Sequence, residues 1–171
     1  MIKRTTNLAL QGGEEVRKLK LILSIIFIIL SLAGIATALT SFYYVYSLNT
    51  SPPACYFNVN NSRVKLNCLN VLKSSYSSLK LNIGIKFNVN LDVLAIIYFT
   101  ISLLLSIIML FTSYSILAQL IWSIIGTAFI PYLVYLEIYV IRSVCIYCTT
   151  MHILIILQLL LSIYYIIKKL I

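Results

Sequence analysis

Long runs without a single charged side chain are the feature that most constrains how this chain can fold. Charge is absent from Leu21 to Ser62 and again from Val93 to Leu136. A helix that crosses the hydrocarbon core of a bilayer needs about 20 consecutive apolar residues, and a soluble domain carries about 25% charged residues. Because only 10% of the residues here are charged and 61% are hydrophobic, we predict an integral membrane protein.

The positions of the charged and polar residues predict four membrane spans. The second uncharged run is about twice as long as one span requires, and the polar residues 112–115 divide it. We therefore expect an all-α integral membrane protein, a four-transmembrane-helix bundle with a large extracytoplasmic loop between spans 1 and 2. The expected ranges are 1–20 for a basic N-terminal segment, 21–46 for span 1, 47–90 for the loop, and 91–112, 116–139 and 145–167 for spans 2, 3 and 4.

Basic side chains at the span ends predict the orientation of the bundle. With four spans, both termini lie on one side of the membrane and the loop lies on the other. The cations that flank spans 1 and 4 are Arg17, Lys18, Lys20, Lys168 and Lys169. Because cytoplasmic flanks are rich in Lys and Arg, we expect cytoplasmic termini. The net charge of +9 then marks membrane boundaries, and we expect lipid but no nucleic acid as a partner.

All four cysteines fall on the outer side in this topology. Cys55 and Cys68 lie in the loop, and Cys145 and Cys148 form a Cys-x-x-Cys motif at the start of span 4. An oxidising compartment outside the cytoplasm permits disulfides, so the cysteines form either two structural disulfides or a redox-active set. A zinc site fits poorly, because the wide spacing of the loop cysteines does not match the usual ligand spacing. We expect no metal site.

The loop cysteines are expected to pair across a hairpin. Residues 56–59 and 64–67 alternate apolar and polar side chains, which is the period of a strand. With a two-residue turn at Asn61–Ser62, Cys55 lies opposite Cys68 in a non-hydrogen-bonded pair, where Cα atoms are about 4.5 Å apart. A disulfide can span that separation, so we predict a Cys55–Cys68 bond.

The Cys-x-x-Cys motif is expected in the first turns of a helix. With Ser143 as the N-cap, both cysteines lie beside the unpaired N–H groups of the helix N-terminus, and Arg142 adds positive charge. These features stabilise a thiolate, as in a reversible redox pair. His152 lies one turn deeper than Cys148 on the same face, where it either stabilises that thiolate or packs in the core. We interpret Glu137 as an interfacial residue near the end of span 3.

These motifs resemble the vitamin K epoxide reductase family, including its prokaryotic disulfide-forming members. The resemblance covers the four spans. It rests on the loop cysteine pair, on Cys68-x-x-Val71-Leu72-x-Ser74-x-Tyr76-Ser77, and on Cys145-Ile146-Tyr147-Cys148-Thr149-Thr150 at the start of span 4. Several bacterial members carry a fused thioredoxin-like domain. None is expected in this chain, so the resemblance implies a separate soluble partner.

The resemblance implies an electron relay through the cysteines. In the family, the outer loop cysteine exchanges with an extracytoplasmic thioredoxin-like protein, and Cys55 matches that position. The inner one, Cys68, bonds transiently to Cys145, and Cys148 faces a quinone of the ubiquinone, menaquinone or vitamin K type. The residues expected at the quinone are Ser74, Asn90 and His152, the last in place of a tyrosine of vertebrate members.

The activity implied by the resemblance is that of a quinone-dependent thiol–disulfide oxidoreductase of a prokaryotic cell membrane, which promotes disulfide-bond formation. The same four thiols also suit a reductase of vitamin K epoxide or vitamin K quinone. From the cysteines alone, a disulfide-stapled membrane scaffold or small transporter subunit without redox turnover is a third interpretation. Substitution of Cys148 separates the enzymes from the scaffold.

Overall fold

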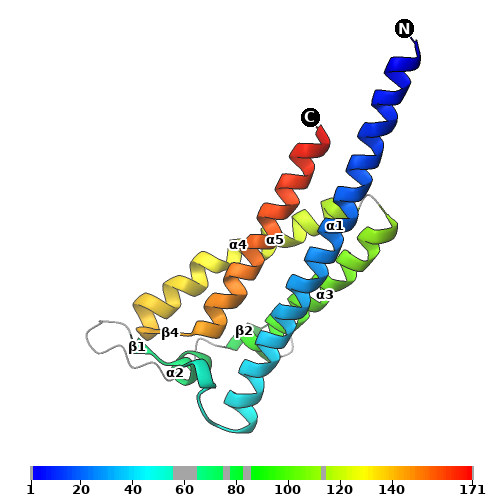
Figure 1. The fold of residues 1–171 in the computed structure, drawn as a ribbon. Helices are drawn as coiled ribbons and strands as arrows, with labels where there is room; N and C mark the ends of the chain where they lie inside the picture. Colours follow the sequence, from blue (N-terminus) through cyan, green and yellow to red (C-terminus); the bar gives the residue numbers. More distant parts are fainter. Residues whose placement is uncertain (1, 56–64, 75–77, 83–85, 113–114, 171) are drawn as a thin grey trace.

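Four long helices form the body of the molecule. The computed structural model describes residues 2–55, 65–74, 78–82, 86–112 and 115–170. The long helices are α1 (Ile2–Phe42), α3 (Leu91–Phe111), α4 (Ser115–Tyr135) and α5 (Ile146–Leu170) (Figure 1). The segments long and apolar enough to cross a membrane are Arg17–Ser47, Leu91–Phe111, Ser115–Ile141 and Ile146–Lys168. The predicted fold class, a helical membrane protein with four spans, is confirmed.

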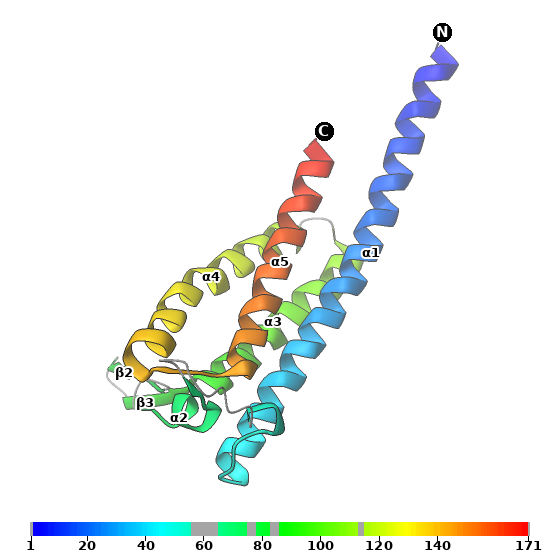
Figure 2. The ribbon, with the colours of Figure 1, turned by 60° about the vertical axis from the view of Figure 1, so that its left-hand side comes forward.

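Helix α1 is much longer than one membrane span. It begins at Ile2, so the segment expected to precede span 1 is part of the same helix. A π-helical turn, η1 (Tyr43–Ser47), continues it at the other end. Its 41 residues correspond to about 60 Å of helix, about twice the thickness of the hydrocarbon core. The N-terminal part therefore projects beyond the other helices (Figure 2).

The two ends of the bundle differ in content. Both chain termini lie at one end, and the short elements between the long helices gather at the other (Figures 1 and 2). The short elements at that second end are the 3₁₀ helix η2 (Pro53–Cys55), the helix α2 (Cys68–Leu72), and the π-helical turn η3 (Leu136–Ile141) that continues α4. The loop after span 1 thus meets the beginning of α5, as the four-span topology requires.

Two small sheets complete this end. Strand β1 (Lys65–Leu66) pairs in parallel with β4 (Ser143–Val144), in the register Lys65 to Ser143 and Leu66 to Val144. Strand β2 (Ser78–Asn82) pairs antiparallel with β3 (Lys86–Asn90), which leads directly into α3. The β1–β4 pair joins segments far apart in the chain and so ties the loop to the entry of α5.

Glycines allow the helices to approach closely. A Cβ atom at Gly34 of α1 would overlap the ring of Phe99, and one at Gly126 of α4 would overlap the ring of Tyr98. Phe99 is fully buried. In a bilayer, lipid tails are as apolar as the side chains, so association of helices depends on such close packing and on hydrogen bonds between them.

A hydrogen-bond network of buried polar side chains connects all four helices. Gln119 of α4 donates to the Ser102 hydroxyl of α3 (2.8 Å), and Ser102 donates to Gln158 of α5 (3.2 Å). Gln158 in turn donates to Ser31 of α1 (3.1 Å), which donates to Ser102 (3.1 Å). All four side chains are fully buried. Polar groups in an apolar medium need such partners, so the network fixes the mutual register of the helices.

Replacing Gln158 with Leu is expected to destabilise the bundle. The change removes the links from α5 to α1 and α3, each worth about 0.6–2 kcal/mol in membrane proteins. We expect the free energy of unfolding in detergent micelles to fall by about 1–4 kcal/mol, the sum of the two links. Thr100→Val is the control, because the exposed Thr100 hydroxyl bonds only the Ile96 carbonyl of its own helix. An equal loss in both variants would contradict the assigned role of the network.

Candidate functional site

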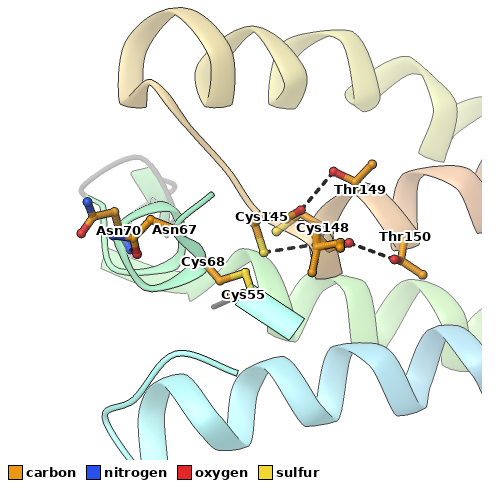
Figure 3. The surroundings of a disulfide bond; sticks show 9 residues. Cys55, Asn67, Cys68, Asn70, Cys145, Cys148, Thr149 and Thr150 are labelled. Carbon is orange, nitrogen blue, oxygen red and sulfur yellow. Dashed lines mark hydrogen bonds between the residues drawn. A yellow bond between two sulfur atoms is a disulfide. The ribbon is translucent and has the colours of Figure 1, made fainter. Parts of the chain in front are cut away.

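Cys55 and Cys68 form a disulfide with a Cα–Cα distance of 5.9 Å, and this pairing was predicted from the sequence. Cys145 and Cys148 are free thiols. Figure 3 shows the four cysteines together at the end of the bundle opposite the chain termini. The structure thus contains one oxidised and one reduced pair.

The prediction that the two cysteines lie on opposite strands of a hairpin is wrong. Cys55 ends the 3₁₀ helix η2, and Cys68 is the first residue of α2. Neither lies in a strand pair, and Leu66 pairs with Val144 of β4. The rest of the expected hairpin, residues 56–64, lies outside the described residues. The alternation of apolar and polar side chains indicated a strand up to Asn67. Instead, the short Asn67 side chain caps a helix that begins at the next residue.

Helix α2 is anchored at both of its ends. The Asn67 side chain accepts a hydrogen bond from the backbone N–H of Asn70 (3.1 Å), which satisfies one of the unpaired N–H groups of the first turn. At the other end, the Tyr46 hydroxyl of η1 donates to the Leu72 carbonyl (3.1 Å). Cys68 and Leu72 are buried. These bonds hold the Cys68 sulfur in place against the core.

Cys145, and not Ser143, is the N-cap of α5. Its carbonyl accepts the first helical hydrogen bond, from the N–H of Thr149 (3.0 Å). Its sulfur accepts a hydrogen bond from the backbone N–H of Cys148 (3.4 Å). The assignment to Ser143 is wrong because pairing with β1 keeps Ser143 and Val144 extended. The Cys145 sulfur therefore receives a backbone donor at the positive end of the helix dipole.

The oxidised and reduced pairs share one apolar cluster. Its buried members are Val45, Cys55, Cys68, Val71, Leu72 and Cys145, and Cys148 packs against them. The hydrogen bond from the Asn67 N–H to the Val144 carbonyl (3.3 Å) extends the β1–β4 pairing up to the two cysteines that follow. The disulfide is thereby held next to the dithiol.

Glu137, interpreted from the sequence as an interfacial residue near the end of span 3, lies near that end and is buried in the protein. It lies in η3 and is only 7% exposed. Its side chain lies close to the backbone N–H of Cys145 and to the thiol of Cys148. A signal was present in the sequence, since Glu137 is the only acidic residue after Asp92. Ionisable residues within membrane spans are rare and commonly functional.

A second buried carboxylate lies nearby. Asp92, in the first turn of α3, is 1% exposed. The hydroxyl of Ser41 lies beside it. By distance and angle, however, neither that hydroxyl nor either carboxylate oxygen has a hydrogen-bond partner among the described residues. Asp92 and Glu137 are both close enough to Cys148 to interact with it electrostatically. The thiols therefore lie between apolar side chains and two acidic groups.

The residues expected at a quinone come from three different elements. Ser74 follows α2 and donates to the Val71 carbonyl (2.8 Å). Asn90 precedes α3, and its side chain forms no capping hydrogen bond. His152 is buried on α5, one turn beyond Cys148. Their roles remain predictions.

The surroundings of Cys148 fit a hydrophobic quinone. Cys148 packs against a second apolar cluster whose buried members are Ala38, Phe99 and Met151. The buried oxygens of Asp92 and Ser41, which have no hydrogen-bond partner in the described part of the chain, supply polar groups nearby. Ligand sites are typically apolar with a few polar groups of this kind. Among the described residues, no three His, Cys, Asp or Glu side chains are placed to hold a metal ion.

Comparison with known proteins identifies a match over most of the chain. The sequence model of the vitamin K epoxide reductase family matches residues 25–163, which include all four cysteines and Glu137. A search of curated proteins finds no match.

Replacing Asn67 with Ala is expected to make the disulfide easier to reduce. Loss of this N-cap costs about 0.5–2 kcal/mol, so α2 frays and the buried Cys68 sulfur becomes accessible. The rate of reduction of the Cys55–Cys68 bond by dithiothreitol should rise, as followed by thiol labelling and mass spectrometry. Asn70→Ala is the matched control, because Asn70 contributes only its backbone N–H to the cap. Equal rates in both variants would show that the cap does not protect Cys68.

Proposed function

The chain belongs to the vitamin K epoxide reductase family, and on that premise we propose that it passes electrons from a thioredoxin-like protein to a quinone. Family membership makes the protein a membrane oxidoreductase. The proposal adds that Cys55 and Cys68 receive electrons from the partner, that Cys145 and Cys148 deliver them to the quinone, and that the net effect is disulfide-bond formation in the partner's substrates.

One observation carries the proposal: a disulfide and a dithiol occupy the same apolar cluster. Thiol–disulfide exchange needs an attacking sulfur that can reach the sulfur under attack. The β1–β4 pairing brings the segments before Cys68 and Cys145 together, so the two pairs can exchange without a large rearrangement. A scaffold held by two structural disulfides would not need Cys145 and Cys148 as free thiols.

The first exchanges reduce the loop disulfide. A thiolate of the partner attacks Cys55, and the Cys55–Cys68 bond breaks with Cys68 as the leaving thiolate. The second thiol of the partner then attacks the mixed disulfide, so that the partner leaves oxidised and Cys55 becomes a thiol. Two electrons have passed from the partner to the loop.

The next exchanges carry these electrons into the bundle. Cys68 attacks Cys145 of an oxidised Cys145–Cys148 pair, and Cys148 leaves as a thiolate. Cys55 then attacks Cys68, which restores the loop disulfide and releases Cys145. The joined Cys55–Cys68 pair and the free Cys145 and Cys148 thiols support this order of exchange. The cap hydrogen bond from the Cys148 N–H to the Cys145 sulfur favours Cys145 as a leaving group.

The final transfer regenerates the Cys145–Cys148 disulfide. The two thiols give up two electrons and two protons as their sulfurs join, and a quinone supplies the oxidising capacity for this step. Cys148 is the half-buried member of the pair and packs against the apolar cluster that contains Met151. Asn90 and His152 are proposed to donate hydrogen bonds to the quinone oxygens, and Ser74 to line the same site.

Replacing Cys148 with Ala tests the relay. The variant should lose quinone reduction by a reduced thioredoxin-like protein, because Cys145 no longer has a partner sulfur with which to form the final disulfide. Cys145 can still attack Cys68 and should accumulate in a Cys68–Cys145 bond, which non-reducing peptide mapping detects. Cys145→Ala, as the matched variant, should also lose turnover but form no such bond.

The same assay discriminates among the three activities. Turnover of a reduced thioredoxin-like protein with a quinone supports the proposal. Turnover of vitamin K epoxide alone would instead identify an epoxide reductase. Absence of turnover with either substrate, together with loss of stability only, would identify a scaffold.

Site-specific labelling tests the proposed orientation, with termini in the cytoplasm and cysteines outside in a prokaryotic membrane. In a background with Cys145→Ser and Cys148→Ser, an exposed Thr50→Cys should react with an impermeant maleimide added to intact cells. An exposed Lys168→Cys should react only after permeabilisation, because Lys168 flanks the opposite end of the bundle. The reverse pattern would place the relay in the cytoplasm and contradict the orientation.

A further inference from the structure

We propose that Asp92 of α3 and Ser41 of α1 together bind an oxygen atom of the quinone. The inference rests on the proposed function for its ligand, and it deepens that function by naming polar groups that hold the quinone ring. Its structural basis is a pair of buried polar side chains for which the described residues offer no hydrogen-bond partner.

The packing of α1 against α3 places the two side chains opposite each other. The helices lie side by side, and α1 ends where α3 begins, so they are antiparallel (Figures 1 and 2). Gly34 of α1 lies against the ring of Phe99 of α3. Seven residues from this contact toward the cysteine end lead to Ser41 on α1 and to Asp92 on α3. Because seven residues are close to two helical turns, both side chains lie on the faces that meet at this contact.

Other contacts between α1 and α3 follow the same register. Toward the chain termini, three residues beyond the glycine contact on each helix, Ser31 donates to Ser102 (3.1 Å). Toward the cysteine end, the next turn of each helix carries an alanine. Ala38 is a buried member of the apolar cluster against which Cys148 packs, and Ala95 packs against the same cluster. Small side chains thus separate the proposed site from the glycine contact, and they allow a planar ring to approach closely.

The two polar groups are buried without partners. Asp92 is 1% exposed and Ser41 is fully buried. Neither the two carboxyl oxygens nor the hydroxyl forms a hydrogen bond within the part of the chain that the structure describes. Burial of polar atoms without partners is unfavourable, and ionisable residues within membrane spans are commonly functional. These three oxygen atoms therefore indicate a ligand that supplies the missing hydrogen bonds.

The chemistry of the two groups suits a quinone oxygen. A quinone oxygen accepts hydrogen bonds and donates none, so its site needs donors. The Ser41 hydroxyl is one donor. The neutral acid form of Asp92, which is far less costly to bury than a carboxylate, is the other. In a hydroquinone the same oxygen carries a hydrogen atom, and the second oxygen of the acid can accept it. The pair can therefore hold the ring in both oxidation states.

The proposed site lies beside the dithiol. On α1, Ser41 lies between Ala38 and Val45, about one helical turn from each. These two residues belong to two different apolar clusters, and Cys148 packs against both of them. A ring held at Ser41 and Asp92 is thus close to the thiol that is proposed to deliver the electrons.

The first test measures stability without a quinone. Asp92→Leu removes the unpartnered carboxyl group and should raise the midpoint of thermal unfolding in detergent micelles, because replacing such a group with an apolar one of similar shape is neutral or stabilising. Thr127→Val is the matched control, since the Thr127 hydroxyl of α4 is also buried without a partner among the described residues. A lower midpoint in Asp92→Leu alone would show that the carboxyl group already has a partner, and would overturn the inference.

The second test measures quinone binding without turnover. In a Cys145→Ala background, the Cys-x-x-Cys motif cannot form its disulfide and the quinone stays oxidised. Short-chain menaquinone and ubiquinone are the probes, and quenching of Trp122, the only tryptophan, reports their binding. Asp92→Leu and Ser41→Ala should each raise the dissociation constant about 2- to 10-fold, which corresponds to one lost hydrogen bond. Asp92→Asn keeps a donor and should keep the affinity, and Thr127→Val should leave it unchanged.

The outcomes separate this inference from the proposed function. Quinone binding that is weakened by Asp92→Leu and Ser41→Ala, in a protein that takes no electrons from a thioredoxin-like protein, would reject the proposed function but support the site. Unchanged affinity in both variants would overturn the inference even if the protein reduces quinones, and would assign the polar atoms to an ordered water.

The control variants decide the remaining outcomes. An equal loss of affinity in Thr127→Val would overturn the inference, because the effect would not be local to the proposed site. A loss in Asp92→Asn as large as in Asp92→Leu would overturn the role of the neutral acid as a donor. If Asp92→Leu does not fold, Ser41→Ala decides, and unchanged affinity in that variant overturns the inference. If the background protein binds neither probe, both the inference and the proposed function fail.

Discussion

The site depends on the pairing of two short strands, β1 and β4. Each strand of this parallel pair is only two residues long. The pair nevertheless joins the loop after span 1 to the segment that enters span 4. Cys68 and Cys145 follow the two strands at nearly equivalent positions, and both come to the start of a helix. Without this pairing, a disulfide tethered only by the loop would have no fixed position relative to the thiols. Apolar burial around Val45 and Leu72 then excludes water from the sulfurs.

Buried polar side chains are hydrogen-bonded to different extents in the middle of the bundle and at its cysteine end. In the middle, Gln119, Ser102, Gln158 and Ser31 form hydrogen bonds with one another across the four helices. The Oε1 atom of Gln119 is the exception, since it has no partner among the described residues. At the cysteine end, the Asp92 oxygens lack partners among the described residues, and burial of an unpartnered polar group costs about 1–3 kcal/mol. Such a cost is tolerated where it serves function.

Sequence reasoning succeeded where a single physical requirement dominates. A membrane span needs about 20 consecutive apolar residues. The four helices could therefore be located from the stretches that contain no charged residue. The Cys55–Cys68 pairing was right, but the hairpin that suggested it was not, because Asn67 begins a helix instead of extending a strand. The N-cap was misplaced from Cys145 to Ser143 because it is determined by a pairing with residues far away in the chain. The burial of Glu137 could not be predicted for the same reason, because it depends on how the turn η3 packs against the rest of the protein.

Because Cys145 is the N-cap of α5, its redox state affects the local structure of this helix. While Cys145 is reduced, its sulfur is a good acceptor for the Cys148 N–H, and this hydrogen bond anchors the first turn of the helix. Once the sulfur is bonded to another sulfur, it accepts a hydrogen bond less well and its direction is set by the new covalent bond. The first turn of α5 should therefore be tightest in the reduced protein and looser after oxidation. The conformation of the helix end that carries the dithiol thus depends on whether this dithiol is reduced or oxidised.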